Sequence, residues 1–342
     1  MDIVIADDSL PFDGTTPLNQ PLGGAEKAIA GLAGALAGRG HHVTVLNHTA
    51  KVVDHAGVAW RPLEDDRPGA CDLLVASRRP DLLDVVGQAR HRALWLAGDA
   101  GYLGQGPHAE AFGRHPGAHL VFGGEPHRAT WTGDAERCVV IPPGVAACYR
   151  EAGAMTPYHP PRAVVTTHPR MGLEGLVRLW ARAIAPRAPL AELLVFSGAL
   201  SAAADGAEVP ADLAGVFNAA RAAAADGVHL VRPLADPDMA DVYRTARVHL
   251  YPGHEKEVYA ATLADSQAVG LPAVARKRGA VPERVRDGRS GYLAPDDEAF
   301  ANCAVLLLND DSVFTTRSRD CRNFQRSRGW DEAAAAFEAL AA

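Results

Sequence analysis

The segment from Tyr251 to Gly291 constrains the fold most, because, together with the apolar run that leads into it, it contains a complete strand, helix and strand. An apolar run, residues 248–251, predicts a buried strand that Pro252-Gly253 closes. A loop with two glutamates then leads to a helix predicted over about 260–269, which Gly270 ends. Residues 271–275 predict the next strand. This order favours a parallel strand pair joined by a helical crossover.

The same alternation of strands and helices recurs along the chain. The first half has predicted strands at 2–6, 43–46, 72–76, 92–97, 119–122 and 138–141, and predicted helices to about Ala37 and near 82–90 and 125–131. Residues 147–161 contain several prolines without periodicity and are predicted to be an interdomain linker. Strands at 163–167, 191–196 and 228–231 restart the pattern. We therefore predict an α/β protein with two Rossmann-like, doubly wound domains, residues 1–150 and 151–326.

Two acids, Glu257 and Asp265, are the informative side chains of the first segment. If both were helical they would lie about 80° apart in azimuth and could border one cleft. The backbone N–H groups of Tyr259, Ala260 and Ala261 are predicted to be free donors at the helix start, which suits an anion. Carboxylates beside a phosphate site suit a ligand with a diphosphate and sugar hydroxyls. The alternative is that Glu257 only offsets the helix dipole and Asp265 faces water.

Two further features belong to the first half. Gly23-Gly24 stands between a predicted strand and a helix, where phosphate can approach the backbone. The three-glycine spacing of a dinucleotide site is absent, and a tight turn is the alternative. Asp99 follows the strand that ends at Ala97, so it is a candidate for a ligand site, or else a turn cap.

Composition excludes several function classes. The net charge of -7 argues against a nucleic-acid-binding protein. The five scattered cysteines indicate a reducing compartment without disulfides or a zinc site, and the histidines have no metal-ligand spacing. Neither a signal peptide nor a membrane-spanning run is recognised. We expect a cytoplasmic protein, for which peripheral contact with the inner membrane surface stays open.

The acidic segment resembles the motif of glycosyltransferase family four, a family of retaining enzymes with the two-domain GT-B fold. The matching residues are Glu257, Tyr259, Ala260, Asp265, Gly270-Leu271-Pro272, Gly279 and Pro282-Glu283. Asp265 departs from the family pattern, in which a second Glu is usual. Ala260 and Ala280 stand where Gly is common. The resemblance implies two domains facing across a cleft, with a C-terminal helix, residues 327–342, that crosses back to the first domain near Trp330.

The resemblance also implies roles for individual residues. Glu257 would bond donor-sugar hydroxyls, and Arg170 would stabilise charge on the leaving diphosphate. Asp99, from its place after a strand, is the candidate for the acceptor side, near the point where many members of the family carry a His. Asp265 would bond the ribose, and the loop of Arg232 and Leu234 would read the base. The donor-binding set is therefore Gly23, Gly24, Thr167, Arg232, Leu234, Tyr259, Ala260, Ala261 and Asp265.

These roles imply a bacterial retaining transferase that moves a sugar from a UDP- or GDP-linked donor to an unidentified acceptor. The acceptor would be a sugar, a lipid-linked molecule or a small molecule, in cell-surface glycan, glycolipid or glycoconjugate synthesis. The donor is a co-substrate, and neither a further cofactor nor a metal is expected. The alternatives are an inactive nucleotide-sugar-binding protein, a nucleotide-sugar epimerase or sugar phosphorylase on the same fold, and a nicotinamide oxidoreductase.

Overall fold

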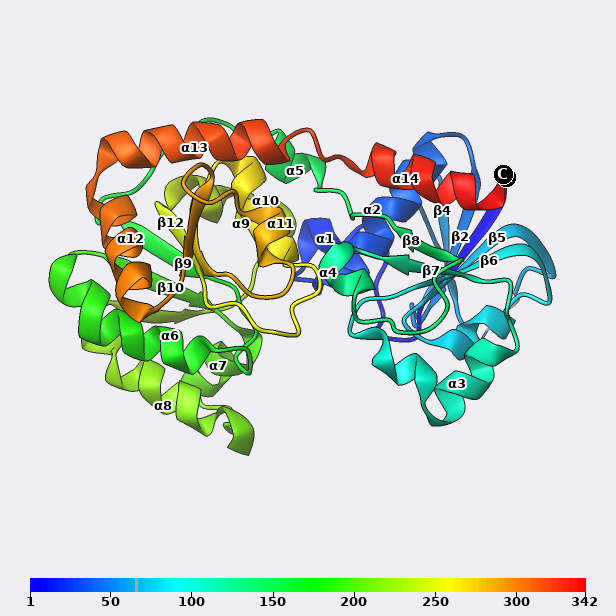
Figure 1. Ribbon diagram of the computed structural model, residues 1–342, viewed down its shortest axis with the longest axis horizontal. Helices are drawn as coiled ribbons and strands as arrows, with labels where there is room; N and C mark the ends of the chain where they lie inside the picture. Colours follow the sequence, from blue (N-terminus) through cyan, green and yellow to red (C-terminus); the bar gives the residue numbers. More distant parts are fainter. Residues whose placement is uncertain (65–66) are drawn as a thin grey trace. The chain divides into compact units, whose positions relative to one another are not determined.

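The computed structural model describes residues 1–64 and 67–342, which form two compact units (Figure 1). The first unit contains Met1–Ala146 and Arg328–Ala342, and the second contains Ala147–Ser327. The division lies after Ala146 rather than after residue 150, because Ala147–Arg150 forms a short helix, α5. This helix packs on α10 (Ala261–Val269) of the second unit, so the predicted linker begins as part of that unit.

The first unit is built on a sheet with the strand order β3-β4-β2-β1-β5-β6-β7-β8. Its neighbouring strands are parallel, apart from the antiparallel pair β3–β4. The strands are β1 (Asp2–Ala6), β2 (His42–Asn47), β3 (Val53–His55), β4 (Val58–Pro62), β5 (Ala70–Ser77), β6 (Gln88–Trp95), β7 (His119–Phe122) and β8 (Cys138–Val140). The helices are α1 (Thr16–Asn19), α2 (Gly24–Gly38), α3 (Gly106–Gly113) and α4 (Glu125–Arg128).

The last helix, α14 (Trp330–Glu338), completes the core of the first unit. It lies beside α2 (Figure 1), and its residues Ala334 and Phe337 are fully buried in the same apolar cluster as Ile29 of α2. Trp330 lies so close to Gly31 that a Cβ atom there would be 2.3 Å from the indole ring. The predicted return of the C-terminal helix to the first domain is therefore confirmed.

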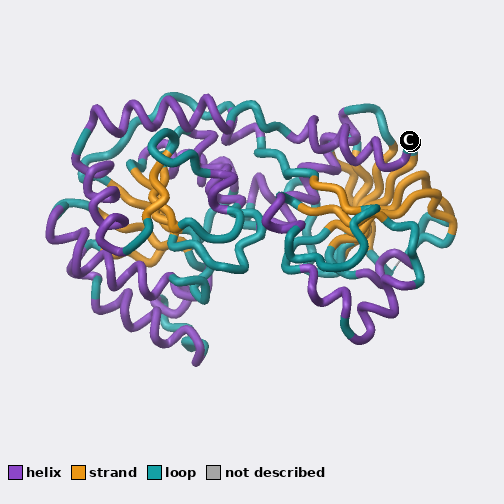
Figure 2. The backbone as a smooth tube through the Cα atoms, viewed as in Figure 1, coloured by secondary structure: helices purple, strands orange, loops and turns teal. Residues whose placement is uncertain are grey.

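The second unit has a sheet with the order β11-β10-β9-β12-β13-β14, and its neighbouring strands are parallel. Helices surround the strands of each unit in the backbone view (Figure 2). The strands are β9 (Arg162–Val165), β10 (Glu192–Phe196), β11 (Val228–Val231), β12 (Val248–Tyr251), β13 (Ala273–Arg276) and β14 (Gly291–Ala294). The helices besides α5 and α10 are α6 (Leu173–Leu179), α7 (Gly198–Ala204), α8 (Ala214–Ala222), α9 (Asp236–Thr245), α11 (Val281–Arg284), α12 (Asp297–Asn309) and α13 (Asp311–Gln325).

Both sheets reverse their strand order at one point, and this positions the candidate sites. The reversal falls at β1 and β5 in the first unit and at β9 and β12 in the second. In open parallel sheets ligands bind at the carboxyl ends of the strands next to such a reversal. The residues that follow Ala6, Ser77, Val165 and Tyr251 are therefore expected to border the ligand sites.

Two parts of the first unit differ from the sequence prediction. The helix predicted near 82–90 is wrong, because Pro80–Asp84 forms only a 3-10 turn and β6 already begins at Gln88. Pairing of β6 along β5 takes residues 88–90 into the sheet. The β3–β4 hairpin was not predicted. No helix among the described residues combines the length and apolarity needed to cross a membrane.

Candidate functional site

The carboxylate of Glu257 lies just beyond the carboxyl end of β12 and is held by three donors. Its Oε2 accepts a hydrogen bond from the Tyr251 hydroxyl at 2.5 Å. Its Oε1 accepts from the backbone N–H of Ala260 at 2.8 Å and of Tyr259 at 3.3 Å. The N-terminus of α10 therefore faces a carboxylate, which the positive end of the helix dipole stabilises.

This arrangement corrects part of the sequence prediction. The N–H groups of Tyr259 and Ala260 are not free anion donors, because the Glu257 carboxylate occupies them. Glu257 itself precedes the helix, which begins at Ala261, so the azimuth argument for two helical acids does not apply. Ala260 has a φ of 54°, the left-handed conformation that favours glycine. The backbone at position 260 therefore has the conformation for which glycine is favoured, although this chain has alanine there.

The backbone of Glu257 is fixed from the other side by the loop after β13. Its carbonyl accepts a hydrogen bond from the Ala280 N–H at 2.8 Å. A Cβ atom on Gly279, whose φ is 47°, would lie only 2.1 Å from that carbonyl oxygen. The neighbouring Tyr259 is held by Arg284, which is 2% exposed, donates to the Tyr259 carbonyl at 2.8 Å and lies over its ring. The turn that carries Glu257 is therefore packed rather than loose.

Asp265 has a different environment, although it lies on the same helix. Burial first, and the charge of Asp265 second, raise the pKa of the Tyr149 and Tyr243 hydroxyls well above 10. The Tyr243 ring stacks on His249 at 5.8 Å, and His249 in turn contacts the edge of Tyr251 at 5.8 Å. The charge of Asp265 thus acts on Tyr149 and Tyr243, at one end of this row of aromatic rings, whereas Glu257 is bonded to Tyr251 at the other.

A buried polar network connects this row to the end of β9. His249 contacts Thr166 Oγ1 at 3.1 Å and Ser266 Oγ at 2.8 Å, and Thr166 donates to Thr262 of α10 at 2.8 Å. Burial lowers the pKa of His249 to about 3, so the ring is neutral at physiological pH. The next residue, Thr167, has a buried hydroxyl oxygen with no hydrogen-bond partner among the described residues.

The two predicted cations, Arg170 and Arg232, are each neutralised by an aspartate in this structure. Arg170 pairs with Asp212 of the 3-10 turn Ala211–Leu213, and Arg232 pairs with Asp205 at 2.6 Å. Both pairs are exposed, so the aspartates can exchange for a stronger anion at little cost. Contact of Arg170, Arg232 and Leu234 with a donor stays a prediction.

A cavity of about 600 Å³ lies at the ends of β13 and β14 in the second unit. It is lined by Gly172, Gly175, Leu176, Leu179, Pro252, Arg276, Lys277, Arg278, Ala294, Pro295, Asp296, Asp297 and Phe300. Its volume is in the range of small-molecule sites. Arg276 pairs there with Asp297, and Arg278 pairs with Glu255 at 3.2 Å, so most of the local charge is compensated.

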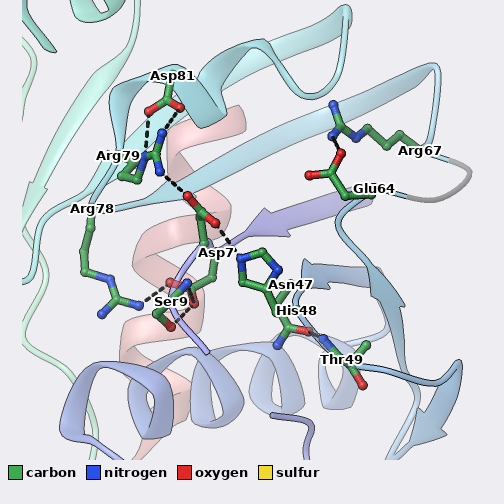
Figure 3. A network of polar contacts seen from close by, with 11 residues as sticks. Asp7, Ser9, Asn47, His48, Thr49, Glu64, Arg67, Arg78, Arg79 and Asp81 are labelled. Atoms are coloured by element: carbon green, nitrogen blue, oxygen red, sulfur yellow. Dashed lines mark hydrogen bonds and ion pairs between the residues drawn. The ribbon is translucent and has the colours of Figure 1, made fainter. Parts of the chain in front are cut away.

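In the first unit, a charged cluster occupies the carboxyl ends of β1 and β5 (Figure 3). Arg78 donates to the fully buried Asp7 and, at 2.8 Å, to the buried Glu26 in the first turn of α2. Burial alone would lower the pKa of Arg78, but the hydrogen bonds and charges of Asp7 and Glu26 outweigh it and raise the pKa. Arg78 also has a φ of 64°, an unusual backbone conformation of the kind found at functional sites.

A second set of pairs extends this cluster. Arg79 bonds Asp81 (Figure 3) and also Asp8. His48 contacts Asp8 at 2.6 Å. Carboxylates that accept and guanidinium groups that donate can together bind a polyhydroxylated molecule. This edge of the sheet is therefore a candidate ligand-binding surface of the first unit.

The other predicted residues of the first unit have structural partners. Asp99 caps a 3-10 turn by accepting from the Gly101 N–H at 2.8 Å, which is the cap named as the alternative to a ligand role. Gly23 precedes α2, where a Cβ atom would lie 2.3 Å from Glu26 Oε2. A contact of Gly23 or Gly24 with a diphosphate stays a prediction.

Sequence reasoning missed three residues of these sites. Arg78 follows a strand that was predicted, so the rule for strand ends was a usable signal. Tyr251 was identified only as the last residue of a strand. Arg284 carried no signal, because its burial under Tyr259 depends on tertiary packing.

Comparison with known families places the strongest similarity in the second unit. Residues 165–310 match the family model described as glycosyl transferases group 1. A D-inositol 3-phosphate glycosyltransferase of Streptomyces bingchenggensis is 32% identical over 106 residues, which are 30% of this chain and 23% of that protein. The chain thus spans about a quarter of the length of such curated relatives. The resemblance inferred from the acidic segment is confirmed for this region.

Solved structures extend the similarity to both units. Sucrose-phosphate synthase from Thermosynechococcus elongatus matches with a TM-score of 0.77 and 16% identity, over 99% of this chain and 98% of that one. Anabaena Alr3699/HepE in complex with UDP and glucose matches with a TM-score of 0.70 and 14% identity, over 99% and 98%. At this identity the similarity concerns the fold alone. The protein has the GT-B fold of two Rossmann-like units, as predicted.

Proposed function

We propose that the protein is a retaining glycosyltransferase that uses a nucleoside diphosphate sugar. The observation that carries the proposal is the placement of Glu257, whose carboxylate is fixed by three donors at the carboxyl end of β12. This residue lies inside the region that matches group 1 glycosyl transferases. An oriented carboxylate at a strand-order reversal suits recognition of sugar hydroxyls.

In the proposed reaction the acceptor hydroxyl attacks the anomeric carbon from the side of the leaving group. The bond between the anomeric carbon and the diphosphate oxygen breaks, a bond to the acceptor oxygen forms, and a phosphate oxygen takes the acceptor proton. Glu257 aligns the sugar through its hydroxyls, and Asp265 takes the ribose. Arg170 leaves Asp212 to stabilise the charge on the diphosphate.

The buried hydroxyl of Thr167 supports a ligand near the end of β9. A buried polar atom without a partner is costly unless a ligand or water satisfies it. Thr262, in the first turn of α10, is bonded to Thr166 at 2.8 Å, so the start of this helix lies next to the end of β9. A protein of the same fold, Anabaena Alr3699/HepE, was crystallised with UDP and glucose and with UDP-glucose, which favours UDP-sugars in the first tests.

The acceptor side belongs to the first unit in this proposal. The cluster around Arg78 offers both donors and acceptors, as a polyhydroxylated acceptor needs. The five free cysteines agree with a cytoplasmic location.

The test is a panel of UDP-, GDP- and ADP-sugars, followed by thermal unfolding and by release of nucleoside diphosphate. A donor at 100 times its Kd should add about 2.7 kcal/mol to the free energy of unfolding. Glu257→Gln should lose turnover by at least about tenfold, whereas the exposed Glu255→Gln, which removes only the Arg278 pair, should not. Binding without turnover would identify an inactive sugar-nucleotide-binding protein. Failure of every donor to stabilise the protein would refute the proposal.

A further inference from the structure

The hydroxyl of Tyr251 is placed to control the plane of the Glu257 carboxylate. Tyr251 is the last residue of β12 and is 4% exposed, so its ring is fixed by the sheet. Its hydroxyl bonds Glu257 Oε2, while the two backbone donors both bond Oε1. The terminal torsion of a glutamate is soft, so anchoring one oxygen alone leaves the other free to swing. The tyrosine supplies the second anchor point.

The protonation state of Tyr251 supports this role. Burial first, and the Glu257 charge second, hold the pKa of its hydroxyl well above 10. The hydroxyl is therefore protonated over the physiological range and acts as the donor. A hydrogen bond from a neutral hydroxyl to a carboxylate is among the stronger ones in proteins.

The other groups that hold this turn act on its main chain or on the ring of Tyr259. Ala280 bonds the backbone carbonyl of Glu257, and Arg284 bonds the carbonyl and covers the ring of Tyr259, so both fix the main chain of the turn. Among the described residues, Tyr251 is the side chain that bonds the Glu257 carboxylate directly.

We propose that Tyr251 is a positioning residue of the transfer site, which acts on the reaction through Glu257 by fixing the direction of its carboxylate. The inference rests on the proposed function, because it assumes that Glu257 bonds the donor sugar. In this proposal the last residue of β12 helps to align the donor sugar. It also explains why a hydroxyl-bearing ring stands at a buried position where Phe would pack as well.

The experiment is a double-mutant cycle of Tyr251→Phe and Glu257→Gln, measured as kcat and KM for the donor. Tyr251→Phe should reduce kcat by about tenfold to a hundredfold with a smaller change in donor KM, because a misdirected carboxylate costs alignment more than binding. In the Glu257→Gln background the same change should reduce kcat less than about twofold, since coupled residues are not additive.

Tyr292→Phe is the matched control. Tyr292 lies on β14 of the same unit, and its hydroxyl accepts a hydrogen bond from Arg317 at 3.3 Å. This variant should keep the kcat of the wild type, and the melting temperature of each single variant shows that it is folded.

Two outcomes would overturn the inference while leaving the proposed function intact. One is a Tyr251→Phe variant with the kcat of Tyr292→Phe. The other is an equal loss in both Glu257 backgrounds, which would show that Tyr251 acts independently of Glu257. If the wild type itself turns over no sugar nucleotide, the proposed function fails, and the role of Tyr251 fails with it.

Discussion

Gly279→Ala should damage both stability and activity, because Gly279 lies against the backbone of Glu257 with no room for a side chain. A Cβ atom at this position would lie 2.1 Å from the Glu257 carbonyl oxygen and 3.0 Å from its carbonyl carbon. Non-bonded carbon atoms prefer about 3.5–4.0 Å, so one of the two segments has to move by more than about 1 Å. The hydrogen bond from Ala280 to the same carbonyl would be strained by that movement.

The expected magnitude has two parts. The φ of 47° costs a non-glycine residue about 1–2 kcal/mol, which a stiffer unfolded chain offsets by about 0.4–1 kcal/mol. Overpacking against the carbonyl adds about 1–3 kcal/mol. We therefore expect the free energy of unfolding to fall by about 1–5 kcal/mol. Displacement of Glu257 by about 1 Å should reduce turnover by about a hundredfold.

Gly288→Ala separates the cost of the positive φ from the cost of overpacking. Gly288 also has a positive φ, 69°, but no atom lies within 4 Å of the Cβ position. This variant should lose only about 1 kcal/mol and should keep its turnover. Chemical unfolding and donor hydrolysis are measured on both variants. Equal losses in the two variants would refute the claim that contact with Glu257 is what requires glycine at position 279.

Three further variants test other parts of the structure. Gln267→Leu should stabilise the protein by about 1–2 kcal/mol in chemical unfolding, because the side-chain amide of Gln267 is fully buried and has no partner among the described residues; an unchanged or lower midpoint would contradict this. His249→Gln should flatten the pH dependence of stability: the wild-type His249 stays neutral to about pH 3, whereas the unfolded chain binds a proton below about pH 6.5, so wild-type stability should fall by up to about 1.4 kcal/mol per pH unit as the pH drops from 6.5. Unfolding midpoints at pH 7, 6 and 5 measure the difference, and parallel curves would argue against it. Gly31→Ala should lower the melting temperature by several degrees through contact with Trp330, whereas Gly34→Ala, with open space around it, should not.

The sequence predicted the fold class because periodicity in strands and helices is a local property. The strand at 248–251 and the helix end before Gly270 agree with the structure to within about two residues, which is the accuracy expected for element ends. The prediction of a helix near 82–90 was wrong because a non-local contact decides the structure there. Pairing with β5 decides the conformation of residues 88–90, and the local sequence does not contain that partner.

The candidate site, too, combines features that are local in the sequence with contacts between distant segments. The acidic segment, the glycine at 279 and the resemblance that singled out Glu257 can all be recognised in the sequence. The groups that hold that carboxylate, Tyr251 and two N–H groups predicted to be free, become visible once the chain is folded. The tertiary structure also brings Asp7, Glu26 and Arg78 together from three separate segments. Hydrogen-bond partners depend on distances of a few ångströms between segments far apart in the chain, and such distances exist only after the sheets and helices have packed.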